Sequence, residues 1–218
     1  MHSNENHSEE LAGYEGSKLA MWIFLSTELL LFGVLFAVYA ILHGVYPEEF
    51  KLAHNSLNKW MGLLNTVILI SSSLSVALSL DSIQRGNPIK TSRLLMLTIL
   101  LAGCFLVVKF FEYNSKFQHG IFPGDALVYL DSMTGQYVPV KPEFKNGINL
   151  FFSLYFVMTG IHGAHVIIGI VVLSVILIKN MKGRYSQKYY TPLENSALYW
   201  HLVDLIWIYL FPLLYLIK

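Results

Sequence analysis

The sequence predicts an all-α membrane protein, a bundle of five transmembrane helices with its N-terminus inside and its C-terminus outside. Hydrophobic residues make up 55% of the 218 residues and charged residues only 13%, about half the charged share of an average soluble domain. Five segments are long and apolar enough to cross a hydrocarbon core of about 30 Å as helices. The basic residues gather in alternate loops, which indicates a defined orientation.

The same composition excludes several other classes of protein. A formal net charge of +1 gives no basic excess for binding nucleic acid. The apolar content is too high for a disordered chain. A disulfide scaffold is excluded because Cys104 is the single cysteine of the sequence.

The chain divides into a short tail and one membrane domain. Residues 1–17 form a polar, acidic N-terminal tail, which lacks the basic start and short apolar run of a secretory signal. Residues 18–218 are expected to form a single transmembrane domain. Its five spans cover about residues 19–42, 61–80, 94–114, 148–178 and 197–217. The fourth span is longer than one bilayer crossing, so it must tilt or protrude.

Turn and capping residues mark the ends of the spans. The sequence Arg85-Gly86-Asn87-Pro88 predicts a turn between spans two and three. Before the fifth span, Thr191 is expected as an N-cap, followed by proline and by Glu194 as a capping-box partner. Residues 116–147 form one long external loop, in which 128–130 and 137–138 flank a possible hairpin turn.

Lysine and arginine counts set the predicted orientation. The loops after spans two and four contain seven basic residues: Arg85, Lys90, Arg93, Lys179, Lys182, Arg184 and Lys188. The loops after spans one and three are longer together but contain only five basic residues: Lys51, Lys59, Lys116, Lys141 and Lys145. Because cytoplasmic loops are rich in lysine and arginine, the N-terminus is placed in the cytoplasm and the C-terminus outside.

Glu28 lies too deep in the first span to reach water. A charge at this depth costs about 2.5–3.5 kcal/mol on insertion scales, so it needs a partner or a role. Two interpretations stay open: a carboxylate that moves protons or binds a lipid headgroup, and a buried carboxyl group hydrogen-bonded to another helix. Matched depth across the bilayer predicts that its partner is His165 of the fourth span.

Lys109 and Glu112 are three residues apart, so they lie on one face of the third span and can pair. Lys109 is near the outer edge of the membrane, where a lysine can extend its ammonium group to the interface. An interfacial ion pair is therefore preferred to a catalytic role. Ser71, Ser75 and Ser79 on span two, and Gly160 with Ala164 on span four, are expected to allow close helix packing.

Two further pairs have the same spacing of three: His162 with His165, and His201 with Asp204. Histidines so spaced can bind a metal or a haem. The two pairs belong to different spans and lack a third strong ligand, so hydrogen bonds between helices are preferred. No metal site is expected.

Several motifs resemble subunit III of the haem–copper terminal oxidases. They keep the family's order and spacing, which makes the resemblance specific over about residues 18–217. The matching segments are 26–28, 109–113, 156–169 and 199–207, with Glu194 at the position of a further family glutamate. The chain is similar to the short five-helix bacterial form of this family, in place of the seven helices of larger members.

The resemblance implies a multi-pass subunit of the bacterial inner membrane without catalytic residues, haem or copper of its own. Subunit I would be its main contact, beside other oxidase subunits and structural phospholipid, with haem and copper in the partner subunits. Glu28, His162 and His165 would line the region that faces lipid and proton uptake. Lys109, Glu112, Glu194, His201 and Asp204 would form a structural polar network. The long external loop suggests a further contact, such as one within a respiratory supercomplex.

The function that the resemblance implies is support of proton uptake and sustained turnover in a proton-pumping oxygen reductase, with cytochrome c oxidase preferred. A quinol oxidase subunit III and an accessory chain of a nitric oxide reductase are the alternatives within this class. More remote alternatives are a small membrane haem protein that uses the histidines and an independent ion carrier. Carriers usually show inverted repeats and broken helices, and the sequence shows neither.

Overall fold

The computed structural model describes residues 2–121, 123–124, 128–131 and 135–217, with only the backbone described for residues 2–14. Within these residues, five helices are long and apolar enough to span a membrane, as the sequence predicts. They are α1 (His2–Val45), α3 (Lys59–Gln84), α4 (Pro88–Gln118), α5 (Lys145–Met181) and α6 (Thr191–Phe211). The polar tail predicted for residues 1–17 is, from His2 onward, a continuation of the first helix.

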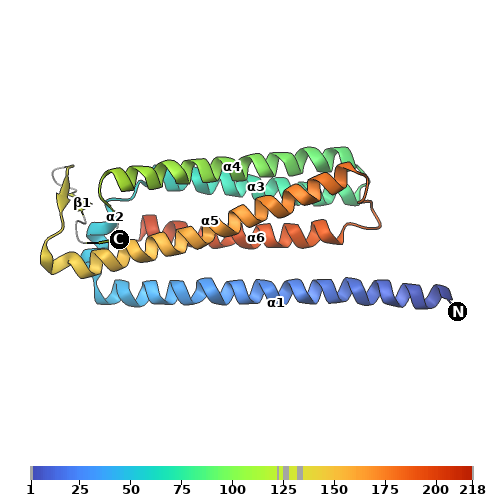
Figure 1. Ribbon diagram of the computed structural model, residues 1–218, viewed down its shortest axis with the longest axis horizontal. Coiled ribbons are helices and arrows are strands. Elements are labelled where there is room, and N and C mark those ends of the chain that lie inside the picture. Colours follow the sequence, from blue (N-terminus) through green and yellow to red (C-terminus); the bar gives the residue numbers. More distant parts are fainter. Residues whose placement is uncertain (1, 122, 125–127, 132–134, 218) are drawn as a thin grey trace.

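The five long helices lie side by side along one axis (Figure 1). Helices α3 and α4 form a closely packed hairpin, α6 packs on α3, and α5 packs on both α4 and α6. Helix α1 contacts α5 and α6 along one edge of this group. The chain therefore forms a four-helix bundle with a fifth helix on its side, and most of the α1 surface stays outside the packed core.

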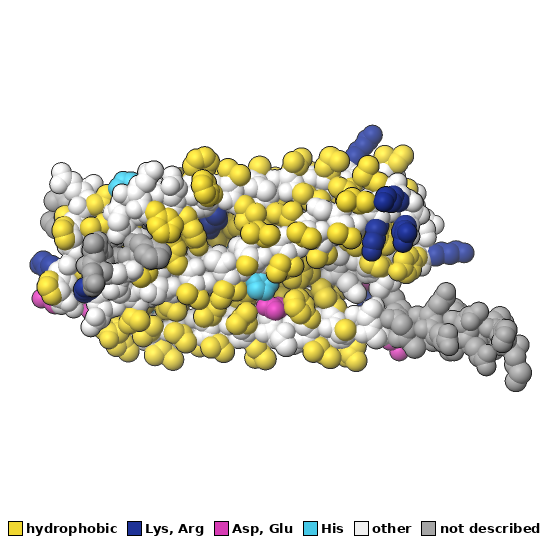
Figure 2. All heavy atoms as spheres, in the orientation of Figure 1, with side chains coloured by type: hydrophobic (Ala, Val, Ile, Leu, Met, Phe, Trp, Pro, Cys, Tyr) yellow, Lys and Arg dark blue, Asp and Glu magenta, His cyan; other side chains and the backbone are white. Residues whose placement is uncertain are grey.

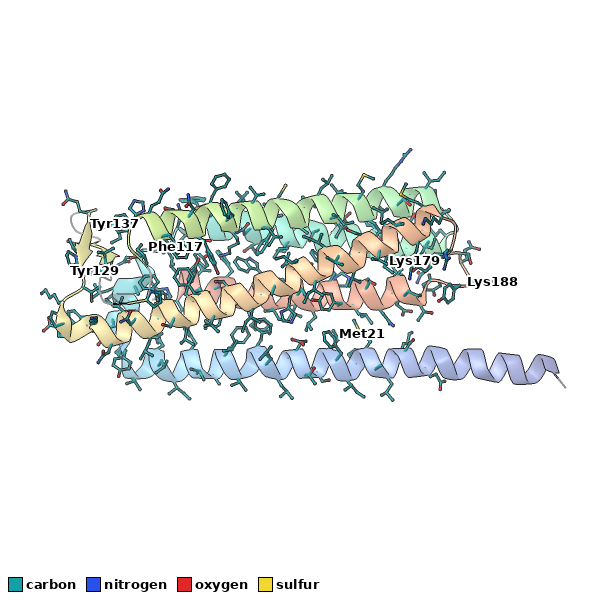
Figure 3. All side chains as sticks on the ribbon, viewed as in Figure 1. Met21, Phe117, Tyr129, Tyr137, Lys179 and Lys188 are labelled. Atoms are coloured by element: carbon teal, nitrogen blue, oxygen red, sulfur yellow. The ribbon has the colours of Figure 1, made fainter. Side chains whose placement is uncertain are left out.

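The two ends of the bundle differ in chemistry. In Figure 3, Lys179 and Lys188 lie at the end where α5 is joined to α6, while Phe117, Tyr129 and Tyr137 lie at the opposite end. Most basic side chains on the face drawn in Figure 2 gather at the same end as Lys179, and the middle is largely apolar. We call the end that contains Lys179 and Lys188 the basic end, and the end that contains Tyr129 and Tyr137 the hairpin end. The gathering of basic side chains at one end agrees with the alternation of the basic loops, while the placement of that end in the cytoplasm stays a prediction.

Local sequence signals account for the turn at the basic end. Helix α3 ends before Gly86, whose φ of 75° lies in the left-handed region that glycine adopts without strain. Asn87 then caps α4, because its side chain accepts a hydrogen bond from the Lys90 N–H at 3.1 Å. The turn predicted from Arg85-Gly86-Asn87-Pro88 is confirmed.

The hairpin end contains the predicted hairpin and two short elements that the sequence did not reveal. Strands β1 (Val128–Leu130) and β2 (Tyr137–Pro139) are antiparallel, with Tyr129 opposite Val138; residues 132–134 of the predicted turn lie outside the described residues. A short helix, α2 (Pro47–His54), follows α1, and a 3-10 turn, η1 (Pro142–Phe144), leads into α5. Because α4 continues to Gln118, the external loop begins later than predicted.

Two predictions about helix ends and packing are wrong. The N-cap of α6 is Tyr190 instead of Thr191, and no side chain caps this helix. Glu194 instead forms an ion pair with Lys18 at 3.0 Å, which ties the basic ends of α1 and α6 together. On α5, a Cβ atom added at Gly160 would have nothing within 4 Å, so this glycine does not mark the close helix contact.

The close approach of α5 to α6 occurs at Gly169. A Cβ atom there would lie 2.6 Å from the ring of Trp200 on α6, so only glycine leaves room for the indole. Trp200 is fully buried, and its Nε1 donates a hydrogen bond to Ser72 of α3 at 3.1 Å. One tryptophan thus fills the space where three helices meet.

Candidate functional site

A polar contact between α1 and α5 joins Glu28 to His165. Glu28 Oε2 lies 2.9 Å from His165 Nε2, and each side chain is 15% exposed. The contact predicted from matched depth is therefore confirmed. It connects α1 to α5 through two residues that are 137 positions apart in the sequence.

The second ring nitrogen of His165 limits the protonation states of this pair. Its Nδ1 lies 2.8 Å from the main-chain carbonyl oxygen of Ile161, which only accepts hydrogen bonds, so Nδ1 carries a hydrogen. The bond from Nε2 to Glu28 then contains one proton, with either a protonated carboxyl beside a neutral ring or a carboxylate beside an imidazolium. The Glu28–His165 pair is thus able to hold one proton in the middle of the bundle.

Neighbouring groups hold the imidazole in place, and one of them, Tyr199, also lines an apolar pocket. The Tyr199 hydroxyl of α6 donates a hydrogen bond to the His165 carbonyl oxygen at 2.9 Å, and the Phe32 ring lies edge-on at 5.6 Å. A pocket of about 270 Å³ lies between α1, α5 and α6 next to Tyr199. Apolar side chains such as Met21, Phe24 and Ile168 line it, toward the basic end of α1.

His162 does not join the Glu28–His165 pair, although it is only three residues away. Its ring is fully buried between Phe105 of α4 at 5.5 Å and Trp207 of α6 at 5.2 Å. Neither ring nitrogen has a hydrogen-bond partner in the part of the chain that the structure describes. His165 turns to α1 and His162 to the bundle core, so the structure separates two residues that the sequence placed in one region.

Lys109 and Glu112 pair as predicted, but the pair does not reach the membrane interface. Lys109 Nζ lies 2.8 Å from Glu112 Oε2, and the two residues are 8% and 2% exposed. The ammonium group turns inward, donates a hydrogen bond to the Tyr215 hydroxyl at 2.9 Å and lies 4.6 Å above the Trp207 ring. The predicted extension of Lys109 to the interface is wrong because this inward position supplies more partners.

Glu112 is the centre of a larger buried network that we call the Glu112 cluster: Lys109, Glu112, Lys116, Tyr155 and Tyr215. Both tyrosine hydroxyls donate to Glu112 Oε1, Tyr155 at 2.9 Å and Tyr215 at 2.6 Å. Lys116 Nζ lies 3.6 Å from the same oxygen. Tyr155 belongs to α5, and Tyr215 to a π-helical turn, η2 (Pro212–Leu216). The cluster therefore fixes α4, α5 and the C-terminal turn to one another.

Sequence reasoning missed three members of this cluster. Lys116 follows Glu112 by four residues, a spacing that favours pairing, but the predicted span ended before it. Tyr155 and Tyr215 give no such signal, because their hydroxyls meet Glu112 only after the helices pack. A second missed contact joins Tyr39 of α1 to His54 of α2, at 2.9 Å between the hydroxyl oxygen and Nε2.

His201 and Asp204 both lie on the side of α6 that borders α3. His201 Nδ1 lies 2.7 Å from the Ser73 hydroxyl oxygen, which links the two helices. Asp204 is 3% exposed, and neither carboxylate oxygen has a hydrogen-bond partner among the described residues. In the described ranges, no group of three or more His, Cys, Asp or Glu side chains is close enough to hold a metal ion.

The comparisons with known proteins all indicate the same family. The family model described as cytochrome c oxidase subunit III matches residues 2–124 and 126–218. A Corynebacterium diphtheriae protein named cytochrome c oxidase subunit 3 is 32% identical over 198 residues, which are 90% of this chain and 85% of the relative. A Bacillus spizizenii protein named quinol oxidase subunit 3 is 29% identical over 99% of this chain and 95% of its own length.

A third relative is much longer than this chain. The Aeropyrum pernix protein named heme-copper oxidase subunit I+III is 28% identical over 231 residues, which cover 96% of this chain and 25% of the relative.

Proposed function

This chain belongs to the cytochrome c oxidase subunit III family, and on that premise we propose that it supports a haem–copper oxygen reductase without a redox centre of its own. It is a multi-pass protein of the bacterial inner membrane, and subunit III functions together with other oxidase subunits. Haem and copper belong to those partner subunits in this proposal. The chain alone is not an enzyme.

Subunit I is the proposed main partner. The Aeropyrum pernix relative is named as a fusion of subunits I and III, which favours direct contact between the corresponding separate chains. The exposed surface also suits a membrane subunit with neighbours, since large apolar side chains are exposed along all five long helices. The β1–β2 hairpin extends beyond the bundle (Figure 1) and is a candidate contact within a respiratory supercomplex.

The Glu28–His165 pair is the observation that best supports a role in proton uptake. A pair that holds one proton in the middle of a membrane bundle is costly to bury and is a functional candidate for that reason. The apolar pocket next to Tyr199, lined by Met21 and Phe24, is suited to a phospholipid acyl chain. We assign to this region the support of proton uptake into subunit I and the binding of structural lipid.

Cytochrome c is the proposed electron donor of the complex, with quinol as the alternative. Relatives of both names match this chain over nearly its whole length, and the donor binds to other subunits. An accessory role in a nitric oxide reductase has no relative among those described to favour it. A haem protein and an ion carrier stay as remote alternatives.

Purification of the native complex through an affinity tag on this chain tests the proposal. We expect subunit I to co-purify, and haem absorption to appear in the complex and not in the isolated chain. A Soret band in stoichiometric amount in the isolated chain would contradict the role without a redox centre. Ion flux through vesicles containing this chain alone would instead support a carrier.

A further inference from the structure

A pocket of about 410 Å³ opens between α3 and α6, away from the Glu28–His165 pair. Its apolar walls include Leu74 and Ala77 of α3 and Leu205 and Ile208 of α6. These side chains are exposed in the chain, with Leu74 62%, Leu205 44% and Ile208 47% accessible. We call it the α3–α6 pocket. Its position in the middle of two membrane-spanning helices places its mouth in the hydrocarbon region.

One wall of this pocket is a carboxyl group without a partner. Asp204 lines the pocket, is 3% exposed, and neither of its oxygens has a hydrogen-bond partner within the described residues. The neighbouring Ser73 hydroxyl lies 2.7 Å from His201 Nδ1. A polar group left unpaired at this depth costs several kcal/mol, and the one hydroxyl next to Asp204 in the described chain, that of Ser73, is engaged with His201.

The other two acidic residues of the bundle interior are satisfied within the chain. Glu28 is bonded to His165 at 2.9 Å, and Glu112 accepts three hydrogen bonds inside its cluster. Both therefore keep their partners in the chain on its own. Asp204 differs from them because it combines a pocket open to the outside with two unpaired oxygens.

The chemistry of the pocket decides between its possible occupants. An acyl chain would fill the apolar walls but has no hydrogen-bond donor for Asp204. A water molecule needs two to four polar partners; Ser73 and His201 also line the pocket beside Asp204, but these two side chains already bond to each other at 2.7 Å. A transmembrane helix supplies both requirements, since its apolar side chains fill the space and one hydroxyl, amide or amine side chain reaches the carboxyl group.

Building on the proposed contact with subunit I, we infer that the α3–α6 pocket is the docking site of a subunit I transmembrane helix that presents a hydrogen-bond donor to Asp204. Ala77 leaves room for this helix to approach, as small residues do where membrane helices meet. Leu74 and Ile208 then pack on either side of the contact. Asp204 is a positioning residue that fixes the depth of one subunit against the other.

Photo-crosslinking in the native complex tests the docking site. A photoreactive phenylalanine analogue replaces Leu74 or Ile208 in the pocket walls, and Leu100 of α4 serves as a control with the same 62% exposure as Leu74. We expect adducts with subunit I from Leu74 and Ile208 but not from Leu100. If subunit I co-purifies but the pocket positions yield only lipid adducts, or Leu100 yields equal subunit I adducts, the docking site is wrong and the proposed function stands.

Variants of Asp204 supply a second measurement. Asp204→Leu removes the hydrogen bond and should lower retention of the chain in the detergent-washed complex about tenfold, the effect of losing about 1.4 kcal/mol. Asp204→Asn, which still hydrogen-bonds, should retain the chain better, and Cys104→Leu on the exposed side of α4 should not change retention. Equal retention of the Leu and Asn variants would overturn the role of Asp204. Loss of subunit I from the unmodified chain would instead contradict the proposed function.

Discussion

Glu28 of α1 and His165 of α5 are joined by a hydrogen bond of 2.9 Å between the Glu28 carboxyl group and His165 Nε2. Because His165 Nδ1 already donates to the Ile161 carbonyl oxygen, the proton in this bond is carried either by the Glu28 carboxyl group or by His165 Nε2. This bond is a polar link between α1 and the four-helix group at mid-span. It also gives the first helix a fixed rotation, since the carboxyl group must face α5.

Infrared spectroscopy can detect this shared proton. Glu28→Gln identifies the carboxyl band of Glu28, and His165→Gln should shift that band because the hydrogen bond to Nε2 is lost. His201→Gln is the matched control, since His201 bonds to Ser73 on the other side of α6. A Glu28 band that ignores the His165 change would contradict the contact.

Glu28→Ala should leave assembly and the initial rate of the oxidase nearly unchanged but shorten sustained turnover several-fold. The expected cause is slower proton supply or loss of lipid next to the pair. Oxygen consumption followed over many turnovers measures the effect. Leu29→Ala, at an adjacent and exposed position of the same helix, should behave like the unmodified chain, and equal decay in both variants would argue against a role for Glu28.

Glu112→Ala should destabilise the chain by about 3–5 kcal/mol, because two buried lysines lose their shared counter-charge. Unfolding by SDS in mixed micelles measures the change. Glu143→Ala is the control for an exposed pair, since Glu143 and Lys141 are 4.0 Å apart and 64% and 69% exposed; its effect should stay below about 1 kcal/mol. Similar losses in the two variants would show that the Glu112 cluster contributes little.

Gly169→Ala should destabilise the contact of α5 with α6 by about 1–3 kcal/mol, because the added methyl group overlaps the Trp200 ring. Gly160→Ala on the same helix has open space around its Cβ and should be neutral or up to about 1 kcal/mol more stable, as alanine favours helix. The two variants are compared by the same unfolding titration. Equal effects would mean that helix propensity, and not the Trp200 contact, decides the outcome.

Sequence patterns identified the elements well and their side-chain partners poorly. The five spans, the turn at Gly86 and the hairpin of β1 with β2 depend on local length, hydropathy and turn residues, and all are confirmed. The N-cap at Thr191 and the outward reach of Lys109 were wrong. In both cases a contact that forms only in the folded chain, Glu194 with Lys18 and Lys109 with Tyr215, competes with the local preference.

Spacing along a helix places two residues on one face but does not say which neighbour that face meets. His162 and His165 illustrate this limit, since a shared spacing of three leads one ring to Trp207 in the core and the other to Glu28 on α1. Matching residues by their depth in the membrane identified the contact of His165 with Glu28, because depth can be compared between helices of known direction. It could not identify the contact of His162 with Trp207, which depends on rotation about the helix axis.

The sequence by itself determined that this chain is a membrane bundle and which family it resembles, because hydropathy and motif order are properties of the chain before it folds. The tertiary structure alone decided that Glu112 binds two tyrosines, that Gly169 admits Trp200 and that Asp204 has no partner in the described chain. These contacts depend on the rotation and tilt of whole helices. Each residue turns a helix by about 100°, so a small change in packing selects a different set of neighbours.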